Sequence, residues 1–388
     1  MTFDIKSNIR IQYYDTAVFD YVSIQCSSYE IDIDRGIDIE QNVFARPKVG
    51  TATVKMMKSS LYDLMNPTGP AYKSNNLFRI QAQLSGGGWL NLFAGVIQNF
   101  EMSYNVDAKK LGITITANDY MKIGLNTQVT SYSVSGTTSA RSFKSQMAGL
   151  STAVNALDSR WTLSQAGTTA SSTTQRANTY PPGADGITCG ELFTQFLDAE
   201  LGWMWIDRDN LARYMTRLDI NALQALTWAG TSGPTVSNVH SSNVNHVCMN
   251  NIELLYKSDE IANQVRVLET ATGIKRTVTN STSVTNFGKQ LADFEVDLDN
   301  SGASTYANWA TEVSAAANPR RLGSVSVPMI TDAGEISEIV TKDIGDFLRV
   351  EFASTGYSNL QEVTIIYSLN HVITPDHWEL TIGLWEGI

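Results

Sequence analysis

The first third of the chain alternates apolar and polar residues, which predicts β-strands. From Ser28 to Glu40 the alternation has a period of two, so one side is apolar and the other acidic, as in a half-buried strand pair. The pattern breaks at Arg35–Gly36, where we expect a turn or bulge. The acidic side carries Asp32, Asp34, Asp38 and Glu40, and the apolar side carries Ile31, Ile33, Ile37 and Ile39.

Shorter strands follow in the same third. The turn residues Asn66–Pro70 precede a hairpin whose two strands are joined around Gly86–Gly88. The strands are expected at residues 50–56, 78–83, 90–96 and 112–117.

Helical periodicity marks the middle third. Apolar residues recur at spacings of three and four between Ser139 and Leu157, which predicts an amphipathic helix. Thr188 and Glu191 match a capping box at the start of a second helix, which we expect Gly202 to end.

The rest of the middle third predicts a hairpin and two irregular segments. The hairpin pairs residues 203–207 with 211–214. The segment 164–182 is rich in Ser, Thr, Gly and Pro and predicts an exposed loop, and the Gly- and Ser-rich segment 229–245 predicts a linker.

The last third returns to strands, interrupted by one helix at residues 303–317. The expected fold class is mainly β with an α+β insertion. We expect a β domain at 1–125, an α+β middle domain at 126–245, and a second β domain with one inserted helix at 246–388. The strands of the last third are expected at 263–268, 274–278, 324–327, 347–352, 362–367 and 377–382.

The net charge of the chain indicates which kinds of partner it can bind. The net charge of −11, from 39 acidic and 28 basic side chains, disfavours a protein that grips nucleic acid, because phosphate binding needs clustered Lys and Arg. An acidic wall would instead repel DNA and let it slide past, and ordinary solubility is the alternative explanation. The first residues show no signal peptide, and no apolar stretch reaches the roughly 18 residues of a membrane-spanning helix. We therefore expect folding in a cytoplasm and later use in a larger assembly.

Catalytic and metal-binding patterns are weak. Cys26, Cys189 and Cys248 lie far apart, so they predict neither a zinc site nor a disulfide framework. His371, Asp376 and His377 lie close in sequence, but surface or packing roles are favoured over a metal site. There is no Gly-x-Ser-x-Gly motif and no phosphate-binding loop. We expect no enzyme activity, no cofactor and no metal.

Trp203 and Trp205 raise the question of a sugar-binding surface. They share one side of the expected hairpin, where they could stack on a sugar, but a core role is favoured.

Several segments in order resemble siphophage minor tail proteins, the tail-tip baseplate hub family. The resemblance rests on short motifs spread over nearly the whole chain: Val18–Val22, Ile33–Gly36, Ala45–Val54, Asn66–Tyr72, Leu201–Asp207, Ile261–Val265, Asn280–Gly288, Trp309–Ala310, Asp343–Asp346 and His371–Trp378.

This resemblance implies a structural, non-enzymatic part of the virion tail tip, assembled in the host cytoplasm, with two tail-tube-like β domains flanking the α+β segment. Three chains would supply six tube-like domains, so that a homotrimer can dock onto sixfold rings. The implied partners are the distal tail protein, the tape-measure protein, tip or fibre proteins, and passing genomic DNA without specific binding. No membrane insertion by this chain is expected. We expect Asp32, Asp34, Asp38 and Glu40 to line or approach the lumen.

Three other functions stay open. They are a distal tail ring protein, a tail-associated glycan or cell-wall hydrolase, and a receptor-binding module carried by residues 139–218.

Overall fold

The computed structural model describes most of the chain, and every structural statement below concerns these residues. They are 5–15, 18–24, 26, 28–40, 44–58, 75–84, 86–105, 110–129, 140–167, 174–176, 188–238, 246–256, 261–269, 273, 275–296, 320–329, 333–353 and 359–385. The expected turn at 66–70 and the expected helix at 303–317 lie outside them.

The N-terminal part is built from strands, as predicted. The hairpin around Gly86–Gly88 and the strands near residues 50–56 and 112–117 are confirmed. The elements are α1 (Ile5–Asn8), β1 (Ile9–Asp15), β2 (Asp20–Ser23), β3 (Ser28–Glu40), β4 (Phe44–Pro47), β5 (Thr51–Lys58), β6 (Leu77–Gln83), β7 (Trp89–Asn105), β8 (Lys110–Asn118) and α2 (Met121–Asn126).

The middle part packs two helices against a small sheet. Both predicted helices and the predicted hairpin are confirmed, and the tryptophans of the hairpin are buried. The elements are β9 (Ala140–Ser142), α3 (Phe143–Leu157), β10 (Leu163–Gln165), β11 (Thr174–Arg176), α4 (Cys189–Glu200), β12 (Trp203–Ile206), β13 (Ala212–Met215), α5 (Arg217–Gln224) and the 3-10 turn η1 (Trp228–Gly230).

The C-terminal part is again mainly strands, and every strand predicted there is present. The elements are β14 (Thr235–Ser237), β15 (His246–Cys248), β16 (Asn251–Tyr256), β17 (Gln264–Glu269), β18 (Lys275–Thr279), α6 (Ser281–Phe287), β19 (Leu291–Val296), β20 (Arg320–Pro328), α8 (Ala333–Val340), β21 (Phe347–Phe352), β22 (Leu360–Thr374) and β23 (His377–Trp385).

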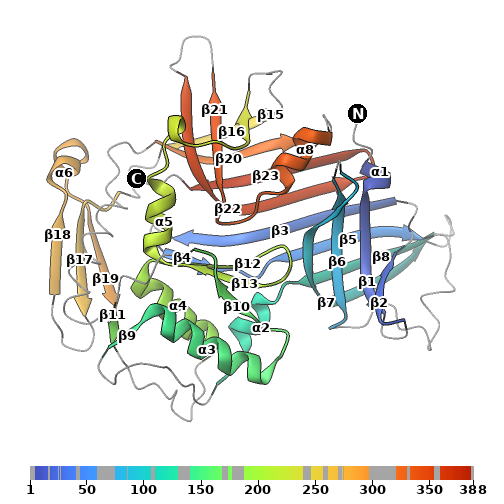
Figure 1. The fold of residues 1–388 in the computed structure, drawn as a ribbon, viewed down its shortest axis with the longest axis horizontal. Coiled ribbons are helices and arrows are strands. Elements are labelled where there is room, and N and C mark those ends of the chain that lie inside the picture. Colours follow the sequence, from blue (N-terminus) through green and yellow to red (C-terminus); the bar gives the residue numbers. More distant parts are fainter. Residues whose placement is uncertain are drawn as a thin grey trace.

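Strands from both ends of the chain join in one large sheet. The order β21-β22-β3-β5-β8-β7-β6-β1-β2 places C-terminal β22 directly beside N-terminal β3. Figure 1 shows β3 running beside β22 across the middle of the molecule, with α3 and α4 below and the β17–β18–β19 sheet to one side. The fold is therefore mainly β with an inserted α+β segment.

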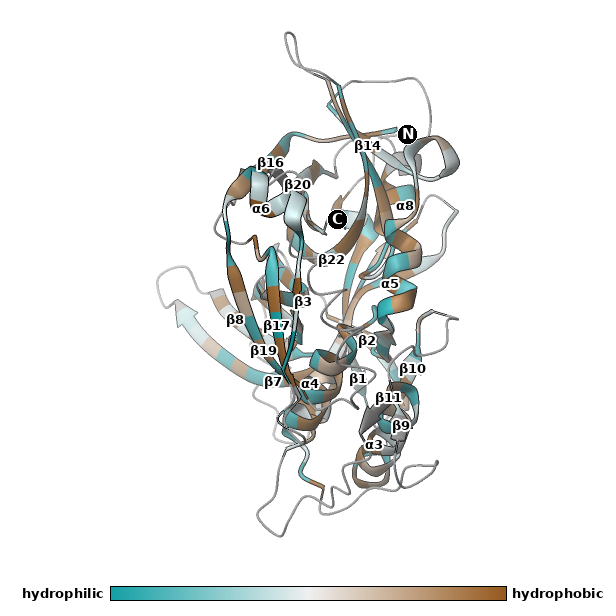
Figure 2. Ribbon diagram, turned by 90° about the vertical axis from the view of Figure 1, so that its left-hand side faces the viewer, coloured by the Kyte–Doolittle hydropathy of each residue, from teal (hydrophilic) through white to brown (hydrophobic). Residues whose placement is uncertain are grey.

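The buried residues form two apolar clusters. The larger cluster fills the inside of the sheet with isoleucines such as Ile31 and Ile33, and the smaller one joins α3, α4 and the β12–β13 hairpin. The hairpin alternates between them, because Trp203 and Trp205 face the larger cluster while Met204 and Ile206 face the smaller. In β7 and β8, by contrast, hydrophilic and hydrophobic residues alternate, as the bands of colour along them in Figure 2 show.

The turn or bulge predicted at Arg35–Gly36 is wrong. Strand β3 runs unbroken through both residues, and Arg35 takes the inward position between Ile33 and Ile37 with only 3% of its surface exposed. Gly36 is required by the neighbouring strand, because a Cβ there would lie 2.7 Å from Ser368 Cβ.

The end of α4 differs from the prediction in one detail. The capping box of Thr188 and Glu191 is present, but the left-handed residue after the helix is Leu201 (φ 53°), not Gly202. Gly202 serves close packing instead, because a Cβ there would lie 2.7 Å from the Met215 carbonyl oxygen.

The linker predicted at 229–245 is wrong over residues 235–237. These residues form β14, a buried strand that pairs in parallel with β15 and β21. Thr235 and Val236 are β-branched residues that favour strands, but the Gly and Ser residues on either side obscured this short signal.

Candidate functional site

One face of the large sheet is polar across strands from both ends of the chain. Asp32 of β3 lies opposite Thr53 of β5 on one side and Val372 of β22 on the other, and Thr53 lies opposite Thr116 of β8. We define the polar face as Glu30, Asp32, Asp34, Thr51, Thr53, Lys55, Asn99, Glu101, Thr114, Thr116, Asn370, Val372, Thr374, Glu379 and Thr381, all exposed or half-buried. The inward residues of the same strands are mostly the buried apolar ones, as the period of two requires, with Arg35 and His371 as buried polar exceptions.

Three of the four acidic residues singled out from the sequence, Asp32, Asp34 and Asp38, lie on this side of β3. Asp32 is exposed and accepts a hydrogen bond from Asn370 Nδ2 at 3.2 Å. Asp34 pairs with Lys48 at 2.6 Å, and exposed Asp38 lies in register with Arg46 of β4. Glu40 ends β3, but its side chain lies outside the described part of the structure.

The polar face carries a negative balance. Its five carboxylates are Glu30, Asp32, Asp34, Glu101 and Glu379, and its one lysine is Lys55. Lys55 pairs with Glu30 at 2.9 Å, and the hydrogen bond and charge of Glu30 raise the pKa of the lysine. An acidic, Thr-rich surface of this kind would repel a polyanion and not hold it.

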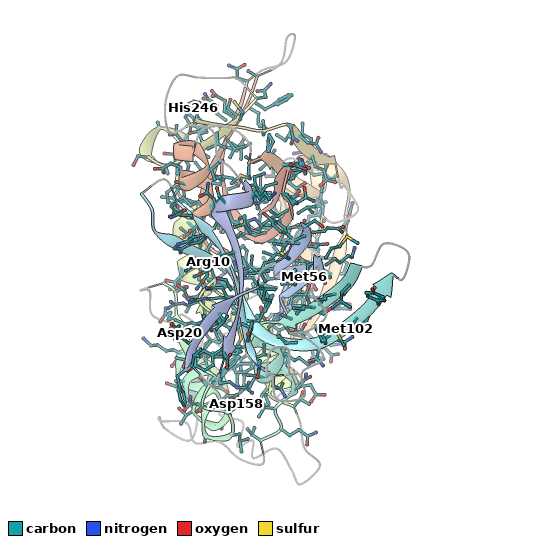
Figure 3. All side chains as sticks on the ribbon, turned by 90° about the vertical axis from the view of Figure 1, so that its right-hand side faces the viewer. Arg10, Asp20, Met56, Met102, Asp158 and His246 are labelled. Atoms are coloured by element: carbon teal, nitrogen blue, oxygen red, sulfur yellow. The ribbon has the colours of Figure 1, made fainter. Side chains whose placement is uncertain are left out.

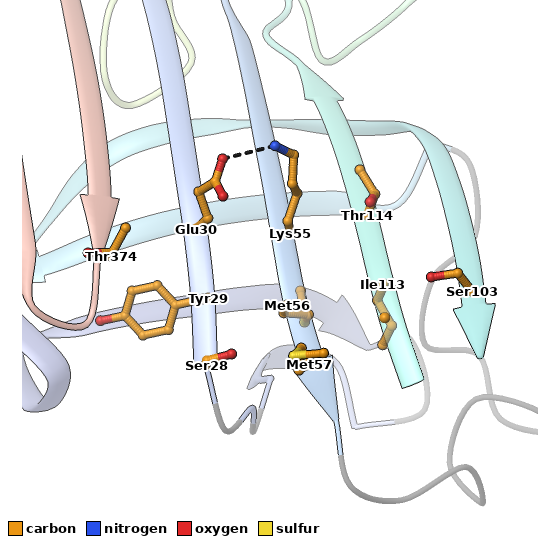
Figure 4. A pocket seen from close by; sticks show the side chains of 11 residues that line it. Ser28, Tyr29, Glu30, Lys55, Met56, Met57, Ser103, Ile113, Thr114 and Thr374 are labelled. Carbon is orange, nitrogen blue, oxygen red and sulfur yellow. Dashed lines mark hydrogen bonds and ion pairs between the residues drawn. The ribbon is translucent and has the colours of Figure 1, made fainter. Parts of the chain in front are cut away.

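A shallow hollow of about 370 Å³ opens at one end of the polar face. Figure 4 shows Glu30 and Lys55 bonded to each other on its wall, beside Thr114 and Ser103. Because its two charged lining residues neutralise each other, the hollow is a poor site for a charged ligand.

The tryptophan pair is part of the core. Trp203 and Trp205 are 2% and 3% exposed, and Trp203 meets Trp385 edge-on at 5.1 Å between ring centroids. These rings are therefore unavailable for stacking on a sugar.

A buried ion cluster joins the three parts of the chain, and the sequence analysis did not predict it. It consists of Arg35 from β3, Arg208 from the β12–β13 turn, and Asp343 from the segment before β21. Arg35 Nη2 donates to Asp343 Oδ1 at 2.9 Å, and the Arg208 backbone N–H donates to Asp343 Oδ2 at 2.9 Å. Burial opposes ionisation of Asp343, but the charges of Arg35 and Arg208 outweigh it and lower its pKa below the ordinary value.

Further bonds extend the ion cluster to the backbone. Arg208 Nη1 donates to the carbonyl of Val340 at 2.7 Å, and Arg35 Nη2 also donates to the carbonyl of Ile206 at 3.0 Å. One feature of the sequence could have predicted the position of Arg35. The alternation of β3 puts Ile31 and Ile33 inside, and because it has a period of two, the next inward position is Arg35.

Two buried titratable groups flank this region. Burial raises the pKa of Asp119 to about 7, although its carboxylate accepts hydrogen bonds from the N–H groups of Gly50 and Met121. Burial, together with the charges of Arg35 and Arg208, lowers the pKa of His371 to about 3. His371 is therefore neutral at physiological pH.

The two histidines near the C-terminus point to opposite sides of the sheet. His371 is buried, and its Nδ1 accepts from Trp378 Nε1 at 3.2 Å. His377 is exposed beyond the β22–β23 turn and lies 3.4 Å from Glu379. Among the residues that the structure describes, no group of three His, Cys, Asp or Glu side chains could hold a metal ion. No helix in this part of the chain is both long and apolar enough to cross a membrane.

Sequence comparisons and structural comparisons give different results. No protein-family model matches the chain, and no curated protein matches its sequence. Solved structures do share its fold. The tail protein from Neisseria meningitidis MC58 aligns with a TM-score of 0.59 at 9% identity, over 98% of this chain and 96% of that one.

Two further structures support the same fold. The 43 kDa tail protein of prophage MuSo2 from Shewanella oneidensis aligns with a TM-score of 0.56 at 12% identity, over 97% of this chain and 98% of that one. A chain of the Francisella PdpA–VgrG complex aligns with a TM-score of 0.50 at 7% identity, over 98% of this chain but 53% of that one.

The chain thus has the fold of phage tail proteins, mainly β and tail-tube-like with an α+β insertion, along nearly its whole length. At the level of the fold, the resemblance to tail proteins seen in the sequence is confirmed.

Proposed function

We propose that the chain is a structural, non-enzymatic subunit of a phage tail tip, a baseplate hub or minor tail protein. Three copies form a ring continuous with the tail tube, let the genome pass, and dock tip or fibre proteins. The site of action is the virion tail tip, after assembly in the host cytoplasm.

The polar face carries this proposal. Strands from the N-terminal and C-terminal parts meet at the β3–β22 pair and present one continuous face of mostly small polar and acidic side chains, with Lys55 and exposed Val372 among them. A channel wall needs such a surface, because it stays hydrated and repels the phosphate backbone. We assign Asp32 and Asp34 to the lumen, with Asp38 and Glu40 approaching it.

The charge of the assembled ring favours the same function. Three chains of −11 sum to −33 (3 × −11), enough to set an acidic potential in a narrow lumen. We propose that residues 1–125 and 246–388 are the two tube-like units and that residues 126–245 brace them. A trimer then offers six such units to a sixfold ring. The partners on either side would be the distal tail protein and the tape-measure protein.

Native mass spectrometry of the purified full-length chain tests the stoichiometry. The proposal expects a trimer of the 42.6 kDa chain. A closed hexamer would assign the chain to the distal tail ring instead. Clear hydrolysis of cell-wall or glycan substrate by the same preparation would overturn the non-enzymatic role.

A further inference from the structure

A second surface differs from the polar face because its charged residues are basic. It is a cleft of about 460 Å³ formed where α1, the start of β1, the end of β2 and the start of β7 meet the β22–β23 turn. We call it the basic cleft and define it by Lys6, Arg10, Ser23, Tyr29, Trp89 and Pro375. Figure 3 shows Arg10 on this side of the molecule. Lys6 and Arg10 are the charged residues among the described side chains that line the cleft.

Arg10 is held in a fixed orientation. Its guanidinium stacks over the ring of Trp89, with 4.0 Å from Cζ to the ring centroid, and its Nε donates to Gln81 Oε1 at 2.6 Å. Gln81 is itself fixed, because its Nε2 donates to Asn91 Oδ1 at 2.7 Å. The amide oxygen of Gln81 must therefore face Arg10.

The hydrogen-bond partner of Arg10 is a neutral amide, which distinguishes Arg10 from six other described arginines. Arg35, Arg46, Arg160, Arg208, Arg213 and Arg266 each pair with a carboxylate. Arg10 and its neighbour Arg79 bond to the amides of Gln81 and Gln12 instead. No described residue accepts a hydrogen bond from the two terminal nitrogens of Arg10.

The charge of Arg10 is thus poorly compensated in its surroundings. Partial burial, and then the nearby charge of Arg79, lower the pKa of Arg10. The opposite charge of an anion placed against the guanidinium would favour its charged form and counteract the repulsion from Arg79. In a chain of net charge −11, a cleft of this kind is selective for a small local anion and unfavourable for a long polyanion such as DNA.

The residues that line the basic cleft indicate which class of ligand it can bind. A fixed guanidinium presents two parallel donors that match a carboxylate. Around it, Trp89, Tyr29 and Pro375 supply apolar and aromatic surface, the composition of hot spots in protein interfaces. We propose that the basic cleft binds a carboxylate-bearing peptide segment of a neighbouring protein, with its carboxylate on Arg10.

The test uses the full-length protein with 5-fluorotryptophan in place of its eight tryptophans, observed by ¹⁹F NMR. The Trp89 resonance is assigned by its loss in Trp89→Phe. The probes are acetyl-Gly-Asp-Leu-Glu-Gly-amide and its uncharged counterpart acetyl-Gly-Asn-Leu-Gln-Gly-amide. We expect saturable movement of the Trp89 resonance with the acidic peptide and none with the uncharged one.

Variants identify the residue responsible. Arg10→Gln should weaken binding at least about tenfold, because a charge-assisted bidentate bond is lost. Arg10→Lys, which keeps the charge and loses the two parallel donors, should lie between Arg10→Gln and the wild type. Arg266→Gln, a charge-matched change outside the cleft, should leave the affinity unchanged. Unmoved resonances of the other tryptophans verify that each variant is folded.

Four results would overturn the proposal. They are an unmoved Trp89 resonance with the acidic peptide, an equal response to the uncharged peptide, equal affinity in Arg10→Gln, and displacement of the acidic peptide by an oligonucleotide. A fifth result would also overturn the proposal: movement of the Trp89 resonance with protein concentration alone, abolished by Arg10→Gln, would assign the cleft to a second copy of this chain.

Discussion

Asp343 binds two arginines that lie far from it in sequence: its Oδ1 accepts from Arg35 and its Oδ2 from Arg208. The first arginine belongs to the strand that pairs with β22, and the second to the turn of the β12–β13 hairpin. One carboxylate therefore ties the N-terminal, middle and C-terminal parts together. This arrangement makes the fold sensitive to the loss of the Asp343 carboxylate.

Replacing Asp343 with Asn should destabilise the protein by about 3 kcal/mol or more, because two arginines would lose the charge that compensates their burial. The change in the urea unfolding midpoint measures this effect. Asp158→Asn, which disrupts a partly exposed pair with Arg160, is the matched control and should cost at most about 1 kcal/mol. Equal effects of the two substitutions would contradict the role of the ion cluster.

Asp119 should make stability depend on pH. Its pKa in the folded state is about 7, against an ordinary value of 3.8, so the folded state binds the proton more tightly than the unfolded chain. The stabilisation from this group is therefore complete below about pH 4 and is lost as pH rises through about 7. The urea unfolding midpoints of the wild type and of Asp119→Asn are compared from about pH 4 to pH 8. As the pH rises, the midpoint of the wild type should fall relative to that of the variant. A difference that does not change with pH would show that Asp119 ionises normally.

Gly36 should be intolerant of a side chain. A Cβ at this position would lie 2.7 Å from Ser368 Cβ and 2.8 Å from the Tyr367 carbonyl oxygen, so Gly36→Ala should push β3 away from β22. We expect a loss of about 1–3 kcal/mol in thermal or urea unfolding. Gly86→Ala is the control, since nothing lies within 4 Å of its Cβ position, and it should be neutral or slightly stabilising. If Gly36→Ala were as harmless as the control, the close β3–β22 contact would be wrong.

Charge reversal on the acidic side of β3 should slow genome release from assembled particles. Asp32→Lys with Asp38→Lys replaces two exposed carboxylates by cations that attract phosphate, so DNA release measured by dye fluorescence should slow severalfold. Glu295→Lys with Glu338→Lys changes the charge equally at exposed positions on β19 and α8, and should release DNA at the wild-type rate. Identical kinetics in the two double variants would argue against a lumenal position for β3.

Local patterns were enough to predict most elements. The period of two in β3 and the spacing of Phe143, Met147 and Leu150 in α3 report directly on which side is buried. The same period placed Asp32 and Asp34 on the outward side of β3. The capping box at Thr188 is likewise complete within four residues.

Features set by distant residues could not be predicted in this way. Arg35 was misjudged because its partner Asp343 is 308 positions away, and a buried arginine is plausible only once that partner is known. The pairing of β22 with β3, which completes the polar face, depends on the same kind of long-range contact. Leu201 adopts a left-handed conformation although glycine follows it, because its side chain is buried and Gly202 must approach Met215 closely.

The central claim is that this chain forms a tail-tip ring with its polar face toward the axis. A cryo-electron microscopy reconstruction of the assembled tail, with this chain located by a tag, tests it most directly. We predict three copies at the tip, with Asp32 and Asp34 facing the channel. Copies placed elsewhere in the virion, or a polar face turned to the outer surface, would contradict the claim.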